Sequence, residues 1–252
     1  MAYTEKTLNA RPLVWAHRGA SAYAPENTLP AFRMAVDMHA DGVELDVHLS
    51  ADGELIVCHD GNIKRTSDGE GDIAKMTLAE LRKYSFNAGK EAFGFVPVPT
   101  LAEVYELLAP TGLTVNVEIK GSDPRIPALC CEAAEKYGMT DRVIYSSFDH
   151  YTLVGIHAVN PRLPVAPLYG SNIVCPWLYA GILGAGAIHP HYGDLQRAPA
   201  EITECHTRGI RVHYWTVDDP AVIETVAKAG CDAIISNKPD VVIDTLKRLA
   251  MY

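Results

Sequence analysis

Segments with two different periodicities of apolar and polar residues alternate along the chain. Short runs either alternate at every position, as residues 42–48 do, or are apolar throughout, which is typical of β-strands. Longer runs place apolar residues three and four positions apart, as Leu29, Phe32 and Val36 do, and this spacing predicts helices. Strands are predicted at 13–16, 42–48, 55–58, 113–119, 143–146, 164–168, 185–189, 211–217 and 232–235. Helices are predicted from Asn27 or Thr28 to near Gly42 and at 78–84, 100–108, 125–137, 149–159, 176–183, 198–208, 219–229 and 239–250.

The alternation of strands and helices predicts the fold class. Roughly eight strand–helix units follow one another, which is the number that closes a parallel (β/α)8 TIM barrel. Most of the strands are almost wholly apolar, as strands covered on both faces must be. An open doubly wound sheet is the alternative, but no Gly-x-Gly-x-x-Gly follows the first strand. We therefore expect residues 1–252 to form a single α/β barrel domain.

One segment interrupts this alternation. Residues 61–98 are polar and rich in glycine, and a short helix at 78–84 is their main regular element. The apolar content is too low to predict a core of their own. We expect residues 61–98 to be a small insertion, or cap, over the active-site face of the barrel.

Charge and composition narrow the classes of partner. The formal net charge of −9 argues against nucleic-acid binding, because such proteins need a basic surface. It does not exclude a phosphate substrate, since a bound cation reverses the local field. The six cysteines form no C-x-x-C pair, so reduced thiols and a cytoplasmic location are expected. The sequence leaves open whether copies of the chain form a homo-oligomer.

No stable membrane insertion is expected. The polar residues 1–11 lack the apolar core of a signal peptide. The longest uncharged stretch, 169–192, is broken by two prolines and several glycines. Within it, residues 173–183 are apolar enough to contact a lipid surface, but a helix that begins at Pro176 and packs on the barrel explains them better.

Carboxylates on two predicted strands indicate a metal site. Glu44 and Asp46 project from the same face of one strand, on the order of 7 Å apart along the backbone. Two carboxylates on an otherwise apolar strand repel each other, and a bound cation removes that cost. Glu118, at the end of the next barrel strand, supplies a third oxygen ligand. Oxygen ligands of this kind favour Mg²⁺ or Ca²⁺ over Zn²⁺.

Cationic and imidazole side chains follow the same strands. In a barrel the carboxyl ends of the strands form the active site, so His17, Arg18, His59 and Lys120 should meet the carboxylates there. Arg18 and Lys120 can hold a phosphate oxygen. One histidine can activate a nucleophile while the other protonates a leaving alcohol. Together with a cation, this set predicts phosphodiester cleavage.

Other histidines and lysine chemistry are weaker candidates. His48 shares the strand face of Glu44 and is expected mainly to brace the ligands. His189 and His191 lack a third ligand, so a substrate-side wall or a plain loop is more consistent with them than a second metal site. A Schiff-base role for Lys120 is disfavoured, because the neighbouring carboxylates keep the amine protonated.

Six motifs, in this order and spacing, resemble the glycerophosphodiester phosphodiesterase family. They are His17-Arg18-Gly19, Pro25-Glu26-Asn27-Thr28, Glu44-x-Asp46, His59-Asp60, Glu118-x-Lys120 and Trp215-Thr216-Val217. The resemblance runs from Trp15 to Pro239. It implies a TIM barrel with a small cap that hydrolyses glycerophosphodiesters to glycerol 3-phosphate and an alcohol.

The resemblance also implies residue roles. His17 and His59 would be the acid/base pair, and Glu44, Asp46 and Glu118 would hold Mg²⁺ or Ca²⁺. Arg18 and Lys120 would contact the phosphate, and Trp215 would form a wall against the glycerol. The leaving alcohol, and the choice between direct hydrolysis and a cyclic phosphate intermediate, stay open.

Two positions depart from the family pattern. Asp218 stands where the family often has Asn, and Ser236-Asn237-Lys238-Pro239 replaces the usual Thr-Asp-x-Pro. We expect these changes to affect only contacts of the last loop, and neither the metal site nor the histidines. Phospholipase D-like or lysophospholipase D activity on lipids is a second hypothesis, and a catalytically silent phosphate-binding barrel is a third. The silent barrel ranks last because every expected catalytic residue is present.

Overall fold

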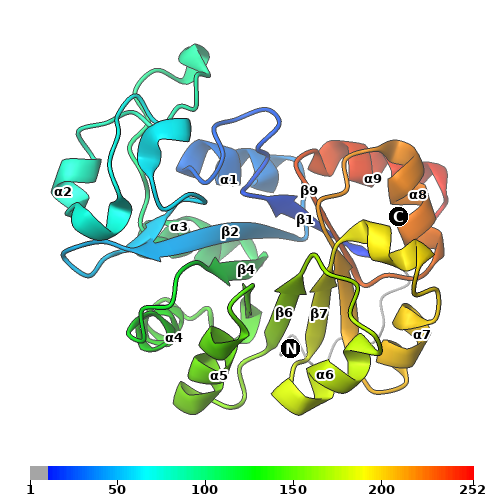
Figure 1. The fold of residues 1–252 in the computed structure, drawn as a ribbon. Helices are drawn as coiled ribbons and strands as arrows, with labels where there is room; N and C mark the ends of the chain where they lie inside the picture. The colour runs from blue at the N-terminus through cyan, green and yellow to red at the C-terminus, as the bar shows by residue number, and fades with distance from the viewer. Residues whose placement is uncertain (1–10) are drawn as a thin grey trace.

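A closed barrel of parallel strands forms the centre of the molecule (Figure 1). The computed structural model describes residues 11–252. The strands are β1 (Leu13–His17), β2 (Gly42–Leu49), β3 (Leu55–Val57), β4 (Thr114–Ile119), β5 (Val143–Ser147), β6 (Val165–Tyr169), β7 (Ala187–Pro190), β8 (Arg211–Tyr214) and β9 (Ala233–Ser236). β3 runs antiparallel to β2 on the outside of the barrel. The other eight strands are parallel, and β1 pairs with both β2 and β9, which closes the ring.

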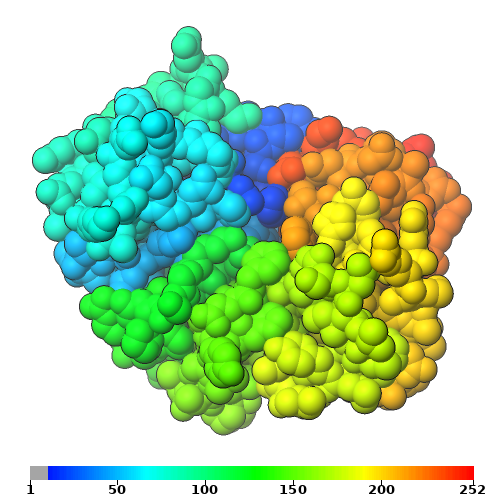
Figure 2. Space-filling model, in the orientation of Figure 1, coloured from blue at the N-terminus to red at the C-terminus, as the bar shows by residue number. Residues whose placement is uncertain are grey.

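Helices surround the barrel, and in Figure 2 the chain colours follow one another around the molecule. The helices are α1 (Leu29–Asp37), α2 (Leu78–Leu81), α3 (Leu101–Leu108), α4 (Ile126–Lys136), α5 (His150–Val159), α6 (Pro176–Leu183), α7 (Glu201–His206), α8 (Pro220–Lys228) and α9 (Pro239–Arg248). The predicted (β/α)8 barrel is confirmed, and the open doubly wound alternative is wrong because β1 pairs with β2 on one side and with β9 on the other, which leaves the ring of parallel strands without an open edge. The strand predicted at 211–217 ends earlier, at Tyr214.

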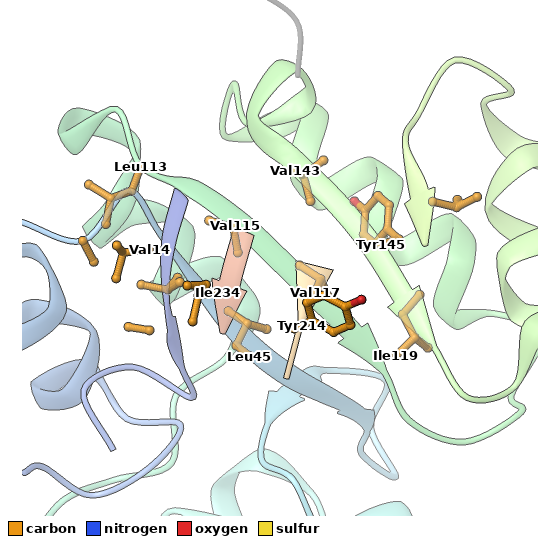
Figure 3. Packing of buried hydrophobic residues seen from close by; sticks show 14 of the residues in the cluster. Val14, Leu45, Leu113, Val115, Val117, Ile119, Val143, Tyr145, Tyr214 and Ile234 are labelled. Carbon is orange, nitrogen blue, oxygen red and sulfur yellow. The ribbon is translucent and has the colours of Figure 1, made fainter. Parts of the chain in front are cut away.

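Alternate positions of each strand point to two different cores. Outward side chains pack against the helices, and Figure 3 shows ten of them labelled: Val14, Leu45, Leu113, Val115, Val117, Ile119, Val143, Tyr145, Tyr214 and Ile234. Inward side chains form a smaller cluster inside the barrel: Leu13, Trp15, Ile144, Ala166, Ala187, Ala233 and Ile235. A Cβ at Gly42 would lie 2.9 Å from the Trp15 ring, so glycine there leaves room for the indole.

Residues 61–98 lie between β3 and α3. They contribute to a small apolar cluster, which they share with β3 and its end: Ile56, Cys58, Ile63, Ile73, Leu81, Phe86 and Val98. The segment contacts the loop after β1, since Lys90 Nζ donates to the Ala22 carbonyl at 3.0 Å. In Figure 2 it is the cyan region beside the blue start of the chain. Among residues 11–252, no helix is both long and apolar enough to cross a membrane.

Candidate active site

The inward face of each strand changes from apolar to polar at its carboxyl end. On β1, Leu13 and Trp15 fill the barrel, and His17 continues the same face into the site. On β2 this face carries Glu44 and Asp46. The sheet register places Glu44 beside His17, and the next barrel strand places Glu118 beside Asp46. The periodicity and register of the strands therefore place these groups together at the carboxyl end of the barrel.

Glu44, Asp46 and Glu118 come together as a group that could hold a metal ion. One oxygen from each lies within 4.8 Å of the others, and all three side chains are buried. Burial, and then the charges of Asp46 and Glu118, raise the pKa of Glu44 well above its ordinary value. Burial and the Asp46 charge raise the pKa of Glu118 to about 7. Such mutual repulsion makes the group a strong ligand set for a cation.

Asp46 is the charged member of the group. Burial raises its pKa, but the positive charges of Lys120 and Arg18 outweigh that effect and hold the pKa at about 2. Lys120 Nζ lies 3.1 Å from Asp46 Oδ1 and also contacts Glu118. Arg18 Nε lies 3.4 Å from Asp46 Oδ2. The two cations predicted to bind phosphate thus flank the carboxylates.

The ligand set fits a divalent cation on this structure's own geometry. Glu44 Oε1 is buried and accepts no hydrogen bond from residues 11–252, while Glu44 Oε2 accepts one from the Arg18 backbone at 2.9 Å. Asn27 Nδ2 donates to Asp46 Oδ2 at 2.8 Å. One oxygen of Glu44 and one oxygen of Asp46 are thereby held by protein donors, and the buried Glu44 Oε1 is left to bind a hard cation.

His17 is oriented by the loop after the last strand. Its Nδ1 lies 2.7 Å from Asn237 Oδ1, and Ser21 Oγ lies 2.8 Å from the same oxygen and 2.7 Å from the His17 carbonyl oxygen. Burial and the Arg18 charge lower the pKa of His17 to about 4. The expectation that the departure at Asn237 leaves the histidines untouched is wrong, because barrel closure brings β9 beside β1.

His59 is held by charged neighbours. Its Nδ1 lies 2.5 Å from Asp60 Oδ1, and Arg65 Nε donates to Asp60 Oδ2 at 2.6 Å. The other end of Arg65 binds Glu26, with NH1 at 2.8 Å from Oε2. Glu26 Oε1 in turn accepts from Arg18 NH1 at 2.9 Å. A continuous network thus joins the second histidine to the arginine beside the carboxylates, and Arg65 comes from the insertion.

A pocket of about 410 Å³ opens over these groups. Aromatic rings form one of its walls. Trp215 is fixed by a hydrogen bond from Nε1 to the His189 carbonyl at 2.8 Å, and Phe148 meets its ring edge-on with the centroids 5.6 Å apart. The His191 ring also meets the Trp215 indole edge-on, with the ring centroids 5.5 Å apart. The lining also includes the predicted residues His17, Arg18, Glu44, His59, Glu118, Lys120 and Trp215.

The remaining histidines occupy different places. His48 Nε2 lies 3.0 Å from the His59 carbonyl, so it braces the segment that carries His59. His189 is fully buried inside the barrel, where its Nε2 lies 2.9 Å from His213 Nδ1. Within residues 11–252, His189 and His191 are joined by no third metal-ligating side chain. His189 is therefore part of the interior rather than a wall of the pocket.

Sequence reasoning gave no role in the site to three residues. Asn27 holds Asp46, Phe148 lines the pocket, and Asn237 orients His17. Asn27 lies inside one of the family motifs, which was a usable signal. Phe148 and Asn237 directly follow strands β5 and β9 and so lie at the carboxyl end of the barrel.

Comparisons with known proteins agree with this geometry. The family model described as "Glycerophosphoryl diester phosphodiesterase family" matches residues 17–241. The chain belongs to this family. It is therefore an enzyme, a phosphoric diester hydrolase of the glycerophosphodiester phosphodiesterase type. A "Glycerophosphodiester phosphodiesterase" of Caldanaerobacter subterraneus is 38% identical over 244 residues, which cover 94% of this chain and 99% of that protein. One of Bacillus altitudinis is 33% identical and covers 90% of this chain and 95% of its own length.

Solved structures of the phosphodiesterase family share the fold. An Oleispira antarctica phosphodiesterase, described in complex with the product sn-glycerol-3-phosphate, superposes with a TM-score of 0.87 at 28% identity. The match covers 94% of this chain and 97% of that one. A glycerophosphoryl diester phosphodiesterase from Silicibacter pomeroyi superposes with a TM-score of 0.86 at 25% identity and covers 96% of both chains.

Proposed function

We propose that this phosphodiesterase hydrolyses glycerophosphodiesters to sn-glycerol 3-phosphate and an alcohol, using two histidines and one divalent cation. The observation that carries the proposal is the position of His17 and His59 on the rim of the buried carboxylate group, in the pocket that Arg18 and Lys120 also line. The product named for the Oleispira relative supports the substrate class.

Glu44, Asp46 and Glu118 would hold the cation, Mg²⁺ or Ca²⁺. When bound, the cation would stabilise negative charge on the non-bridging phosphate oxygens. Arg18 and Lys120 would hold the same phosphate by charge-assisted hydrogen bonds. Trp215 would pack its indole face on the glycerol carbons, and its hydrogen bond to the His189 carbonyl fixes the ring for that purpose.

Each histidine presents one defined nitrogen to the substrate. His17 Nδ1 donates to the amide oxygen of Asn237, so His17 Nε2 keeps its lone pair and can take a proton from the attacking hydroxyl. That hydroxyl belongs to water or to the substrate's own 2-position. His59 Nδ1 is paired with Asp60, and His59 Nε2 would give its proton to the leaving alcohol oxygen as the P–O bond breaks.

The insertion contributes to the site in this proposal. We place residues 61–98 as a cap on a single barrel domain, because Arg65 ties the segment to Asp60 and Glu26 at the rim. The six cysteines are all free, which supports the cytoplasmic location expected from the sequence.

The test is release of glycerol 3-phosphate from glycerophosphocholine with Mg²⁺, with Ca²⁺ and with EDTA. EDTA should abolish release, and His17→Ala and His59→Ala should each lower kcat by about 10²-fold or more. His157→Ala is the matched control, because that side chain lies outside the pocket, where its Nε2 lies 3.1 Å from the Leu163 carbonyl oxygen. Full activity in EDTA or in either pocket variant would contradict the proposal. A preference for lysophosphatidylcholine would favour the lipid hypothesis instead.

A further inference from the structure

Asp218 is linked to His17 through Asn237. Within residues 11–252, its hydrogen bonds go to Ser236 and Asn237, in the loop that orients His17. Its Oδ1 accepts from Ser236 Oγ and from the Asn237 backbone N–H, both at 2.8 Å. Its Oδ2 accepts from Asn237 Nδ2 at 2.6 Å. A carboxylate that accepts three such bonds requires the amide nitrogen of Asn237 to face it.

The orientation of the Asn237 amide then decides the tautomer of His17. With Nδ2 turned to Asp218, Oδ1 must face His17 Nδ1, and the distance between them is 2.7 Å. An amide oxygen only accepts hydrogen bonds, so the proton sits on Nδ1 and the lone pair on Nε2.

We propose that Asp218 is a positioning residue for catalysis, which acts through Asn237 to keep His17 in the tautomer with a free Nε2. The inference rests on the proposed role of His17 as base. The same pair accounts for both departures from the family pattern. This chain has Asp at 218 and Asn at 237. In the pattern that the chain resembles, Asn is frequent at the first position and Asp is usual at the second, so one carboxylate and one amide are kept but exchanged.

The exchange makes a specific prediction for single and double variants. In Asp218→Asn, the side-chain oxygen can still accept from Ser236, but its amide nitrogen then meets Asn237 Nδ2. Two donors repel, and the Asn237 amide turns over, so that Nδ2 faces His17 Nδ1 and the proton moves to Nε2. In Asn237→Asp, two carboxylates face each other across the 2.6 Å contact. In the double variant D218N/N237D every donor meets an acceptor again.

The experiment compares these three variants with the wild-type enzyme in kcat and KM for glycerophosphocholine. We expect Asp218→Asn to lower kcat by about 10²-fold with little change in KM, and the double variant to recover most of the loss. The nitrogen chemical shifts of ¹⁵N-labelled His17 should report a proton on Nδ1 in the wild type and the double variant, and on Nε2 in Asp218→Asn.

Asp219→Asn is the matched control. Asp219 caps helix α8 by accepting from the Ala221 N–H at 2.8 Å, and it makes no contact with Asn237. Asparagine is an equally good helix cap, so this variant should keep both kcat and the His17 tautomer. Wild-type kcat with Nδ1–H in Asp218→Asn, or a double variant no better than the single ones, would overturn the proposal. The nitrogen shifts need no turnover, so they test the relay even if His17→Ala leaves activity intact and the proposed mechanism fails.

Discussion

At the residue scale, the buried carboxylates depend on partners behind them. Asp46 is fully buried, and Asn27 meets it twice, since Nδ2 donates to Oδ2 at 2.8 Å and Oδ1 accepts from the Asp46 N–H at 3.3 Å. Asn27 adopts φ of +57°, a conformation that asparagine tolerates better than most residues. One amide therefore fixes both the side chain and the backbone of a proposed metal ligand.

We predict that Asn27→Ala weakens divalent-cation binding by about 10- to 100-fold, because loss of a partner behind a metal ligand lets the ligand rotate. Calorimetric titration of the metal-free enzyme with Mg²⁺ and Ca²⁺ measures this directly. Asn62→Ala is the control, since Asn62 Nδ2 also donates to an aspartate, Asp72, at 2.8 Å but within the insertion. Equal cation affinity in Asn27→Ala and the wild type would show that Asp46 holds its position without the amide.

Phe148 shows how an exposed apolar residue can belong to a site. It is 51% exposed, yet it lines the pocket and stacks edge-on against Trp215. We predict that Phe148→Ala raises KM for glycerophosphodiesters by about 10-fold with a small effect on the free energy of unfolding, because little buried area is lost. Steady-state kinetics with two different leaving alcohols measure the effect. Tyr151→Ala, at a position 86% exposed, should leave KM unchanged.

At the element scale, Arg65 ties the insertion to the mouth of the barrel by charged contacts. Arg65 bridges Asp60, next to His59, and Glu26, which binds Arg18. We predict that Arg65→Gln lowers kcat by about 10-fold, because both ends of the network lose a fixed partner. Its effect on stability should be small, since Arg65 is half exposed.

Lys64→Gln is the matched control for Arg65→Gln. Lys64 is the preceding residue, and among residues 11–252 its one ion pair is with exposed Glu70, at 3.4 Å. Its loss removes the same charge from the same segment without touching the network. Equal kcat values for the two variants would show that the insertion does not support His59 or Arg18.

The elements themselves were largely predictable from the sequence, because the two-residue period of a strand determines which side chains share a face. The alternation over 42–48 places Glu44 and Asp46 on one face, and the structure keeps them there. The contact between His17 and Asn237 spans 220 positions and exists because β1 pairs with β9. Local pattern carries no information about that register, so the role of Asn237 could not be predicted. The insertion packs its few apolar residues against Ile56 of β3, and its own polar, glycine-rich sequence carries no information about that contact.

At the scale of the whole molecule, the cluster of carboxylates links stability, pH and metal binding. In the metal-free protein the pKa of Glu118 is raised to about 7 by burial and by Asp46, and the pKa of Glu44 is raised as well. An acid whose pKa is raised by folding contributes stability that is fully present below its unfolded pKa of about 4.5. That contribution is lost as the pH rises through the folded value of about 7.

A divalent cation should therefore stabilise the enzyme more at pH 8 than at pH 5, because at pH 5 it must displace protons from Glu44 and Glu118. At a cation concentration 100 times Kd the stabilisation is about 2.7 kcal/mol, or a rise in Tm of roughly 5–10 °C for a chain of this size. Thermal unfolding with Mg²⁺ or Ca²⁺ and with EDTA, from pH 5 to pH 8, measures the difference.

Glu118→Gln separates this linkage from the other titrations of the protein. The amide keeps the shape of the side chain but cannot ionise, so the metal-free variant should lose less stability than the wild type between pH 5 and pH 8. The same variant should bind the cation weakly, and the metal-induced rise in Tm should shrink at every pH. If the wild type gains the same Tm from metal at pH 5 as at pH 8, the cation does not bind through these buried carboxylates. A pH dependence identical in Glu118→Gln and the wild type would instead place the titrating group elsewhere in the chain.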